Sequence, residues 1–218
     1  MSIREVVQLL PSSAEARQWF QAAAMLDSML AMDEASSVYR FDSAWAPRQG
    51  LASMQNGSGD HFFIVFGDGS AWLKGFDHES QMSPFREEPP RLWPGLFSLL
   101  PNCLMALLKE PAFAVDCTTF CTWNLGDGHG WTHDYLELPN GLDPDGATHL
   151  TSPLLHGRQG YLEHCKDYFE VGMEDEVLQH FFGLSPLSRK QFDALPTAVD
   201  WPAAVSNAVA IGYPVAHD

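Results

Sequence analysis

The sequence of 218 residues predicts a single α+β domain over residues 1–218, with an antiparallel sheet packed by N-terminal and C-terminal helices. Three observations support this prediction. An apolar stripe with helical spacing lies near the N-terminus, a β-hairpin signal spans residues 61–76, and helical stripes return after residue 157. No βαβ periodicity, internal repeat or low-complexity linker interrupts the pattern, and 45% hydrophobic residues suffice for a packed core.

The first helix is predicted over about residues 13–32. Ser12 is followed three positions later by Glu15, which is the spacing of a capping box. Apolar side chains then recur every three or four residues at Trp19, Ala23, Leu26 and Leu30. A short strand over residues 36–41 is expected to follow.

The hairpin signal consists of two apolar runs, residues 61–66 and 71–76, around the turn residues Asp68 and Gly69. A turn centred on these two residues pairs positions whose numbers sum to 137. One face of the hairpin is then wholly apolar and must be core. The other face carries His61 and Lys74, so we expect it to be only partly covered, either lying under a helix or lining a cleft.

The remaining segments alternate between loops and helices. Residues 77–90 read as a loop, and a helix is predicted to begin near Pro94 and to be split or kinked at Pro101. Residues 112–123 have the composition of a strand, although 118–121 could equally form a helical turn. Turn residues dominate 127–130 and 140–146. The predicted helices after residue 157 contain Tyr161, Leu162, Cys165 and Phe169, then Val177, Leu178, Phe181 and Phe182, and a last helix covers about 201–209.

The charge excludes several classes of partner. With 12 Lys and Arg against 28 Asp and Glu, the net charge is −16, and no basic cluster is longer than Arg189-Lys190. Such a chain lacks the basic groove that holds phosphate backbones, so nucleic acid is not expected as a partner. Anionic lipid and a bilayer span are disfavoured as well. The N-terminal residues lack a secretory signal, which predicts a cytoplasmic protein.

The negative charge is concentrated in the second half of the chain. Residues 1–109 hold 12 acidic and 8 basic side chains, whereas residues 110–218 hold 16 acidic and 4 basic ones. No basic residue occurs between Lys109 and Arg158. These carboxylates are either simply solvated or form a negative field that attracts a cation or a basic partner.

Cysteine usage and known motifs offer no catalytic signature. We expect Cys103, Cys117, Cys121 and Cys165 to be reduced and either buried or inert, because a chain of this size needs no disulfides. The sequence contains no Gly-x-Ser-x-Gly elbow, phosphate loop or dinucleotide fingerprint, so no cofactor is predicted.

The first candidate site is Asp77, His78 and Glu79, which directly follow a predicted strand. Side chains at the end of a strand are well placed for catalysis or binding, because the sheet fixes the backbone. On an extended chain only Asp77 and Glu79 would converge. In the alternative interpretation, Asp77 and a nearby serine cap local turns and His78 bonds to the backbone.

The second candidate is a metal site formed by Asp127, His129, His133 and Asp134. Imidazole and carboxylate are usual ligands of zinc, and the two histidines are four residues apart. Glycines on both sides of His129 argue against a helix there, and the glutamate of a His-Glu-x-x-His motif is absent. No ligand spacing is found for His149, His156, His164, His180 and His217.

Two segments carry a resemblance. The hairpin with its Gly-Phe-Asp-His-Glu-Ser-x-Met-Ser-Pro loop, residues 75–84, and the Thr-Phe-Cys-Thr-Trp segment, residues 119–123, resemble a group of uncharacterised bacterial proteins. The resemblance spans about residues 57–131, and no activity is attached to it. It implies that Asp77, His78 and Glu79 matter for folding or for function.

These observations lead to two functional hypotheses. The first is a non-enzymatic, cytoplasmic binding protein whose acidic half meets a basic protein, with an immunity-type inhibitor as the concrete version. The second is a metal-assisted hydrolase in which the 77–79 loop meets His129 or His133 in one pocket. A third interpretation is that both motifs only organise loops. The oligomeric state is not predicted.

Overall fold

The computed structural model describes residues 1–126 and 128–216, which contain seven α-helices and six strands. The helices are α1 (Ile3–Leu9), α2 (Ser13–Leu30), α3 (Ala147–Leu155), α4 (Gly157–Tyr168), α5 (Asp175–Phe182), α6 (Arg189–Asp193) and α7 (Trp201–Ile211). The strands are β1 (Tyr39–Ala46), β2 (Gln49–Gln55), β3 (His61–Phe66), β4 (Ala71–Phe76), β5 (Phe120–Asn124) and β6 (Thr132–His133). The predicted α+β class is confirmed.

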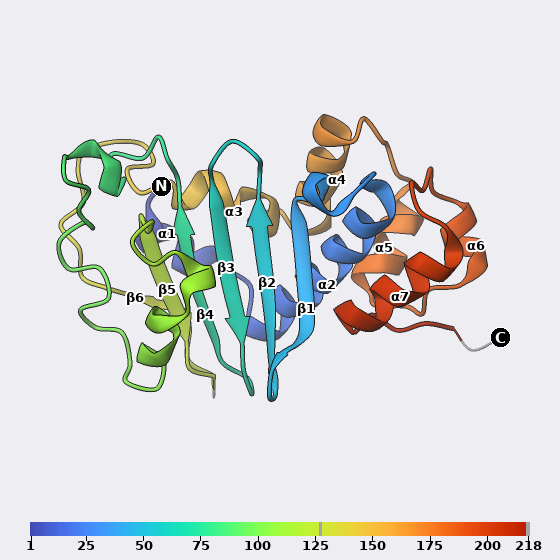
Figure 1. Ribbon diagram of the computed structural model, residues 1–218, viewed down its shortest axis with the longest axis horizontal. Helices are drawn as coiled ribbons and strands as arrows, with labels where there is room; N and C mark the ends of the chain where they lie inside the picture. The colour runs from blue at the N-terminus through green and yellow to red at the C-terminus, as the bar shows by residue number, and fades with distance from the viewer. Residues whose placement is uncertain (127, 217–218) are drawn as a thin grey trace.

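The strands form one antiparallel sheet in chain order, from β1 to β6 (Figure 1). The predicted hairpin is confirmed with its register, since His61 pairs with Phe76 and Phe66 with Ala71. A second hairpin of β1 and β2 replaces the single short strand expected at 36–41. Its turn holds Arg48 at φ 62° rather than a glycine, so it lacks the usual sequence signal.

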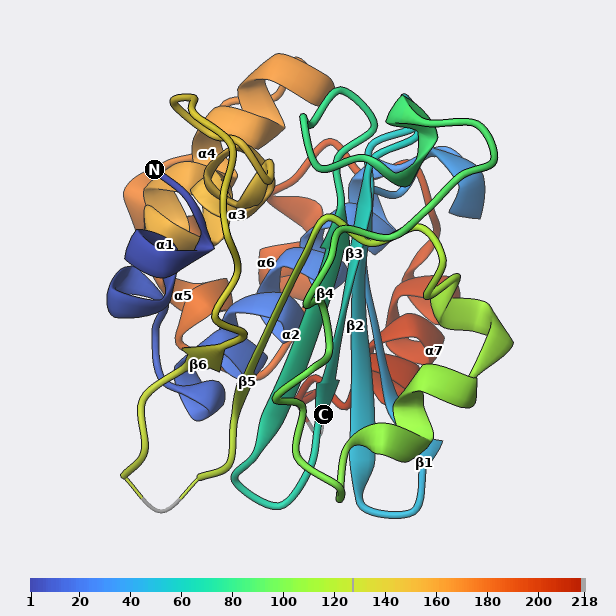
Figure 2. The same ribbon diagram turned by 90° about the vertical axis from the view of Figure 1, so that its left-hand side faces the viewer.

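Both faces of the central strands β3 and β4 are buried. On one face, Phe62, Ile64 and Leu73 join the core formed with the helices. On the other, Phe63, Val65 and Trp72 join a second cluster. Figure 2 shows α1 and α2 on one side of the sheet and the segment of residues 84–118 on the other. The hairpin face with His61 and Lys74 is therefore covered, as expected. The segment that covers it is residues 84–118 rather than an α-helix, and the face does not line a cleft.

The cover, residues 84–118, corrects the prediction of a helix from Pro94. It contains only the 3₁₀ turns Pro84–Arg86, Met105–Lys109 and Pro111–Phe113. Gly95 and Phe97 have φ angles of 92° and 68°, which an α-helix does not allow. The apolar side chains at 96, 100, 104 and 107 have helical spacing but instead pack on the sheet from successive turns.

The observed helices agree in part with those predicted from the sequence. Helix α2 begins at the predicted capping box, in which Ser12 N donates to Glu15 Oε2 at 3.0 Å and Glu15 N donates to Ser12 Oγ at 3.3 Å. Helices α4, α5 and α7 confirm the three predicted C-terminal helices, whereas α1, α3 and α6 had no prediction. No helix among the described residues is long and apolar enough to cross a bilayer.

A buried carboxyl group, Asp27, joins three elements. It is fully buried on α2 and accepts hydrogen bonds from the backbone N–H groups of Val38 and Tyr39 at 2.9 and 2.8 Å. The hydroxyl of Tyr161 on α4 donates to its other oxygen at 2.8 Å. Burial raises the pKa of Asp27 to about 7, although these hydrogen bonds oppose the rise.

Replacing Asp27 by asparagine should change the pH dependence of stability. A carboxyl group with a raised pKa in the folded state stabilises the protein fully only below its unfolded pKa, and this contribution is lost as the pH rises through about 7. The neutral amide introduced by D27N would mimic the protonated carboxyl group. From about pH 4 to about pH 8, D27N should therefore gain on the order of 2 to 4 kcal/mol of unfolding free energy relative to the wild type.

Urea unfolding of both proteins across this pH range measures the difference. Y161F is the control, because it removes one hydrogen bond at a cost of about 1 kcal/mol but keeps the carboxyl group. A difference between D27N and wild type that does not vary with pH would contradict the raised pKa.

Candidate functional site

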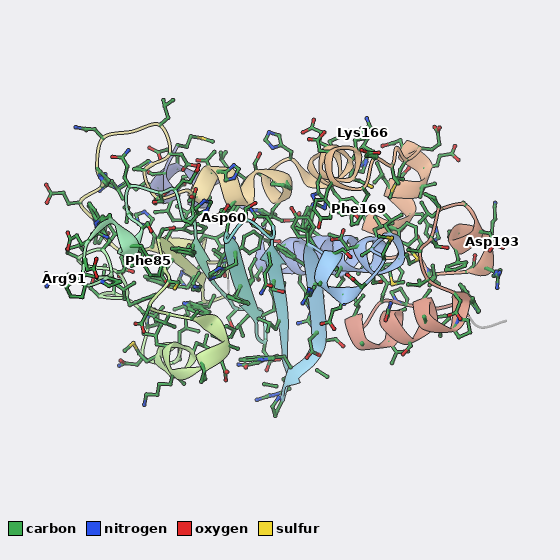
Figure 3. All side chains as sticks on the ribbon, turned by 45° about the horizontal axis from the view of Figure 1, so that its top comes forward. Asp60, Phe85, Arg91, Lys166, Phe169 and Asp193 are labelled. Carbon is green, nitrogen blue, oxygen red and sulfur yellow. The ribbon has the colours of Figure 1, made fainter. Side chains whose placement is uncertain are left out.

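Asp77 and His78 come together with Asp60, a residue that sequence reasoning missed. One ligand atom from each of these three side chains lies within 4.8 Å of the others. Asp60 stands directly before β3 and Asp77 directly after β4, so the hairpin register places them opposite each other. The residue numbers 60 and 77 sum to 137, as for every pair of the predicted hairpin. The predicted register could therefore have identified Asp60 as the partner of Asp77. Figure 3 labels Asp60 at the end of the strands that lies beside α3.

Hydrogen bonds fix the orientation of Asp60 and His78. Asp60 Oδ1 lies 2.6 Å from His78 Nδ1 and accepts the backbone N–H of His78 at 2.9 Å. Asp60 Oδ2 accepts the amide of Asn56 at 2.8 Å. The hydrogen bond that His78 Nδ1 donates to Asp60 raises the pKa of His78. Burial raises the pKa of Asp60, but its hydrogen bonds with His78 and Asn56 outweigh burial and lower it overall.

The turn after β4 reorients the side chains that an extended chain would have pointed apart. Asp77 Oδ1 accepts the backbone N–H of Glu79 at 2.8 Å, as the turn-capping interpretation expects. A Cβ on Gly146, the residue before α3, would lie only 2.3 Å from Asp77 Cβ and Oδ2. Gly146 also has φ 75°, so glycine is required for this approach.

The third predicted residue, Glu79, remains outside the cluster. Its side chain is 85% exposed, and Oε1 lies 3.9 Å from His78 Nε2. His78 itself is 44% exposed. Because Nδ1 faces Asp60, Nε2 is left toward solvent and Glu79. The arrangement can therefore hold an oriented imidazole or bind a cation, which are the two chemistries open to it.

His129 and His133 do not meet the 77–79 loop. Leu73 pairs with Thr122, which in turn pairs with His133. At about 3.3 Å per residue and about 4.8 Å per strand, His133 is roughly 15 Å along the sheet and two strands away from His78. His129 lies beyond it in the turn between β5 and β6. The register thus corrects the expectation of a shared pocket.

The two aspartates of the predicted metal site, Asp134 and Asp127, must be considered separately. Asp134 is 1% exposed, and its carboxylate accepts the backbone N–H groups of Phe97 and Leu99 at 2.9 and 2.7 Å and the hydroxyl of Ser98 at 3.2 Å. It therefore holds the cover in place rather than a metal. Asp127 lies outside the described residues. His133 Nδ1 faces the carbonyl of Asp134 at 2.6 Å.

Lys74 is a fully buried cation on the covered face of β4. Its Nζ lies 3.2 Å from His61 Nε2 and donates to the carbonyl groups of Ala114 at 3.3 Å and of Cys117. Burial lowers the pKa of Lys74 to about 8 and, together with the charge of Lys74, lowers the pKa of His61 to about 4. Neutral His61 can then accept from Lys74, and Lys74 in turn holds the cover through its hydrogen bonds to Ala114 and Cys117.

All four cysteines are free thiols, as predicted. Cys121 and Cys165 are buried, and burial raises the pKa of both thiols, that of Cys165 to about 12. These two are therefore poor nucleophiles. Cys103 is exposed and Cys117 half-buried, so for these two the prediction reduces to their being inert.

The acidic half has two kinds of carboxylate. Asp134 and Asp145 are buried, and Asp143 accepts the backbone N–H groups of Thr148 and His149 at the start of α3. These three serve the fold. Six of the exposed carboxylates lie within the short segment 163–176, a set that we call the α4–α5 acidic surface. It comprises Glu163, Asp167, Glu170, Glu174, Asp175 and Glu176.

Little positive charge offsets this surface. Lys166 is the basic residue within 163–176, and Arg158 is already paired with Asp175 at 3.0 Å. In Figure 3, Lys166 and Phe169 lie at α4, well apart from Asp60. The α4–α5 acidic surface and the Asp60 cluster are therefore separate features.

A groove of about 370 Å³ opens on the α4–α5 acidic surface. It is lined by Ser152, Pro153, Glu163, His164, Asp167 and Tyr168. Burial lowers the pKa of His164 to about 4, so the ring adds no positive charge at neutral pH. This ring stacks on Tyr168 with centroids 5.5 Å apart, and its Nε2 is buried without a hydrogen-bond partner among the described residues.

Removing Asp134 should destabilise the fold if it anchors the cover. D134A leaves the part-buried backbone N–H groups of Phe97 and Leu99 without their acceptor, which should cost about 1 to 3 kcal/mol in unfolding free energy. H129A, in the exposed turn of the same predicted metal site, should change stability by no more than about 0.5 kcal/mol. Chemical denaturation with and without EDTA measures both. An EDTA-dependent loss of stability in the wild type that is absent in both variants would instead indicate a metal site at these residues.

Comparison with known proteins finds no relative. No protein-family model matches the chain, and neither a curated protein nor a solved structure is significantly similar to it. The function of the protein must therefore be inferred from its own side chains.

Proposed function

We propose that the protein is a non-enzymatic, cytoplasmic binding protein that docks a basic protein on its α4–α5 acidic surface. The observation that carries this proposal is the groove between Glu163 and Asp167, which is negative and concave and has an aromatic wall. A lysine or arginine side chain of the partner fits these three properties. Its cationic group would meet the carboxylates, and its stem would lie along Tyr168.

The spacing of the two carboxylates supports this proposal. Glu163 and Asp167 are four residues apart on α4, so both project from one face of the helix. Like charges at this spacing destabilise a helix by about 0.2 to 0.5 kcal/mol. A bound cation would relieve the repulsion. The same repulsion disfavours an acidic partner group at this position and favours a basic one.

The wider surface adds electrostatic steering. Carboxylates on both α4 and α5 present one sign of charge, which accelerates encounter with an oppositely charged partner and disfavours acidic ones. An immunity-type inhibitor is the concrete version of this function, because an inhibitor of a basic toxin needs fast and selective association. A binding mode of this kind must weaken as salt is added.

Reversing the two groove charges should weaken binding without unfolding the protein. The partner is first captured from a lysate of the native host at low salt and identified. Calorimetry with the purified partner should then show binding weakened at least about tenfold by E163K/D167K and by rising salt. The single variant D167K places a lysine four residues after Glu163, so it should keep or raise the melting temperature while weakening binding.

The matched control is D116K/E137K, which makes the same change in net charge at two exposed acidic residues outside the α4–α5 acidic surface. It should bind within about threefold of the wild type. Equal weakening by both double variants, or a captured partner without excess positive charge, would contradict the proposal. For the immunity version, the partner should arrest cell growth, and co-expression of the wild-type chain should restore it.

A further inference from the structure

The Asp60 cluster takes no part in the proposed function, yet it gathers two carboxylates and one imidazole, with a third carboxylate, that of Glu79, beside it. Asp60 and Asp77 face His78 inside it, and Glu79 stands at its rim. No lysine or arginine forms an ion pair with any of these carboxylates in the part of the chain that the structure describes. The negative charge of the cluster is thus offset only by His78.

We propose that Asp60, Asp77 and His78 bind a divalent transition-metal ion of the Zn²⁺ or Mn²⁺ type. Their ligand atoms lie within 4.8 Å of one another, and His78 Nδ1 lies 2.6 Å from Asp60 Oδ1. Around a tetrahedral zinc ion with bonds of about 2.1 Å, neighbouring ligand atoms are about 3.4 Å apart. The required adjustments are therefore shifts of about 1 Å, within the reach of side-chain rotation.

The surrounding hydrogen bonds hold the carboxylates as a metal site requires. Asn56 orients Asp60 through Oδ2, and the backbone N–H of Glu79 holds Asp77 through Oδ1. Outer partners of this kind fix ligands and are usual in metal centres. Oδ2 of Asp77 accepts no hydrogen bond from the described residues and lies beside Gly146, whose missing Cβ leaves room for the carboxylate.

The site is open on one side. His78 is 44% exposed and Glu79 85% exposed, which gives an ion and its remaining water ligands access from solvent. A metal ion bound through Nδ1 takes the place of the proton between His78 Nδ1 and Asp60 Oδ1: an imidazolium ring releases that proton to water, and a neutral ring carries its proton on Nε2 instead. One imidazole with two carboxylates suits zinc or manganese, whereas calcium and magnesium prefer oxygen ligands alone.

Calorimetry with ZnCl₂ on the untagged, EDTA-treated full chain tests this site. We expect one equivalent of Zn²⁺ to bind, with the affinity reduced at least about tenfold in D77N and in H78Q. Both variants are designed to fold: the asparagine of D77N can still accept the N–H of Glu79, and the glutamine of H78Q can still donate to Asp60. H149A is the matched control, because it removes an exposed histidine outside the cluster and should leave the affinity unchanged.

Cobalt gives a second readout. Visible absorption of Co²⁺ bound to the wild type should report nitrogen and oxygen ligands and should be lost in H78Q. The absence of saturable binding near one equivalent would overturn the proposal. So would Zn²⁺ affinity that is equal in wild type, D77N and H78Q, or Ca²⁺ binding as tightly as Zn²⁺.

Discussion

The pairing of β3 with β4 is the constraint on which the rest of the structure depends. Successive side chains of a strand face opposite sides, so a slip of one residue would exchange every buried side chain between the two faces. Here the register directs Ile64 and Leu73 to the helices and Phe63 and Trp72 to the cover. The same register places Asp60 opposite Asp77, so the packing of the core and the geometry of the polar cluster have one origin.

The parts of the fold that could be predicted from the sequence are those with local signals. A capping box and an apolar stripe predict α2, and Asp68 and Gly69 predict the hairpin with its register. The β1–β2 hairpin has no such turn signal. The cover was mistaken for a helix because its leucines have helical spacing, while the reason for their presence is the distant face of β3 and β4. Contacts between residues far apart in the chain decided its conformation.

The polar residues can likewise be divided into those that the sequence identifies locally and those whose role depends on distant parts of the chain. Sequence position identified Asp77 and His78 as notable, but only the hairpin register reveals Asp60 as their partner. His129 and His133 have ligand spacing, yet the sheet separates them from the 77–79 loop. The charge count could not distinguish Asp134, an internal hydrogen-bond acceptor, from Asp167, a solvent-exposed group, because both are aspartates in an acid-rich half. Burial, rather than residue type, assigns their roles.

The two faces of the sheet are covered differently, and this difference affects how the protein unfolds locally. Residues 84–118 add no strand to the sheet, so the cover can detach without breaking a ladder hydrogen bond between strands. Its polar attachments include those to Lys74 and Asp134, and the remainder is side-chain packing. Regions of this kind form cooperative units that exchange with solvent below the free energy of global unfolding. Trp72 and its neighbours would then be the first apolar surface that a protease, a chaperone or an aggregating chain encounters, while the helical core stays closed.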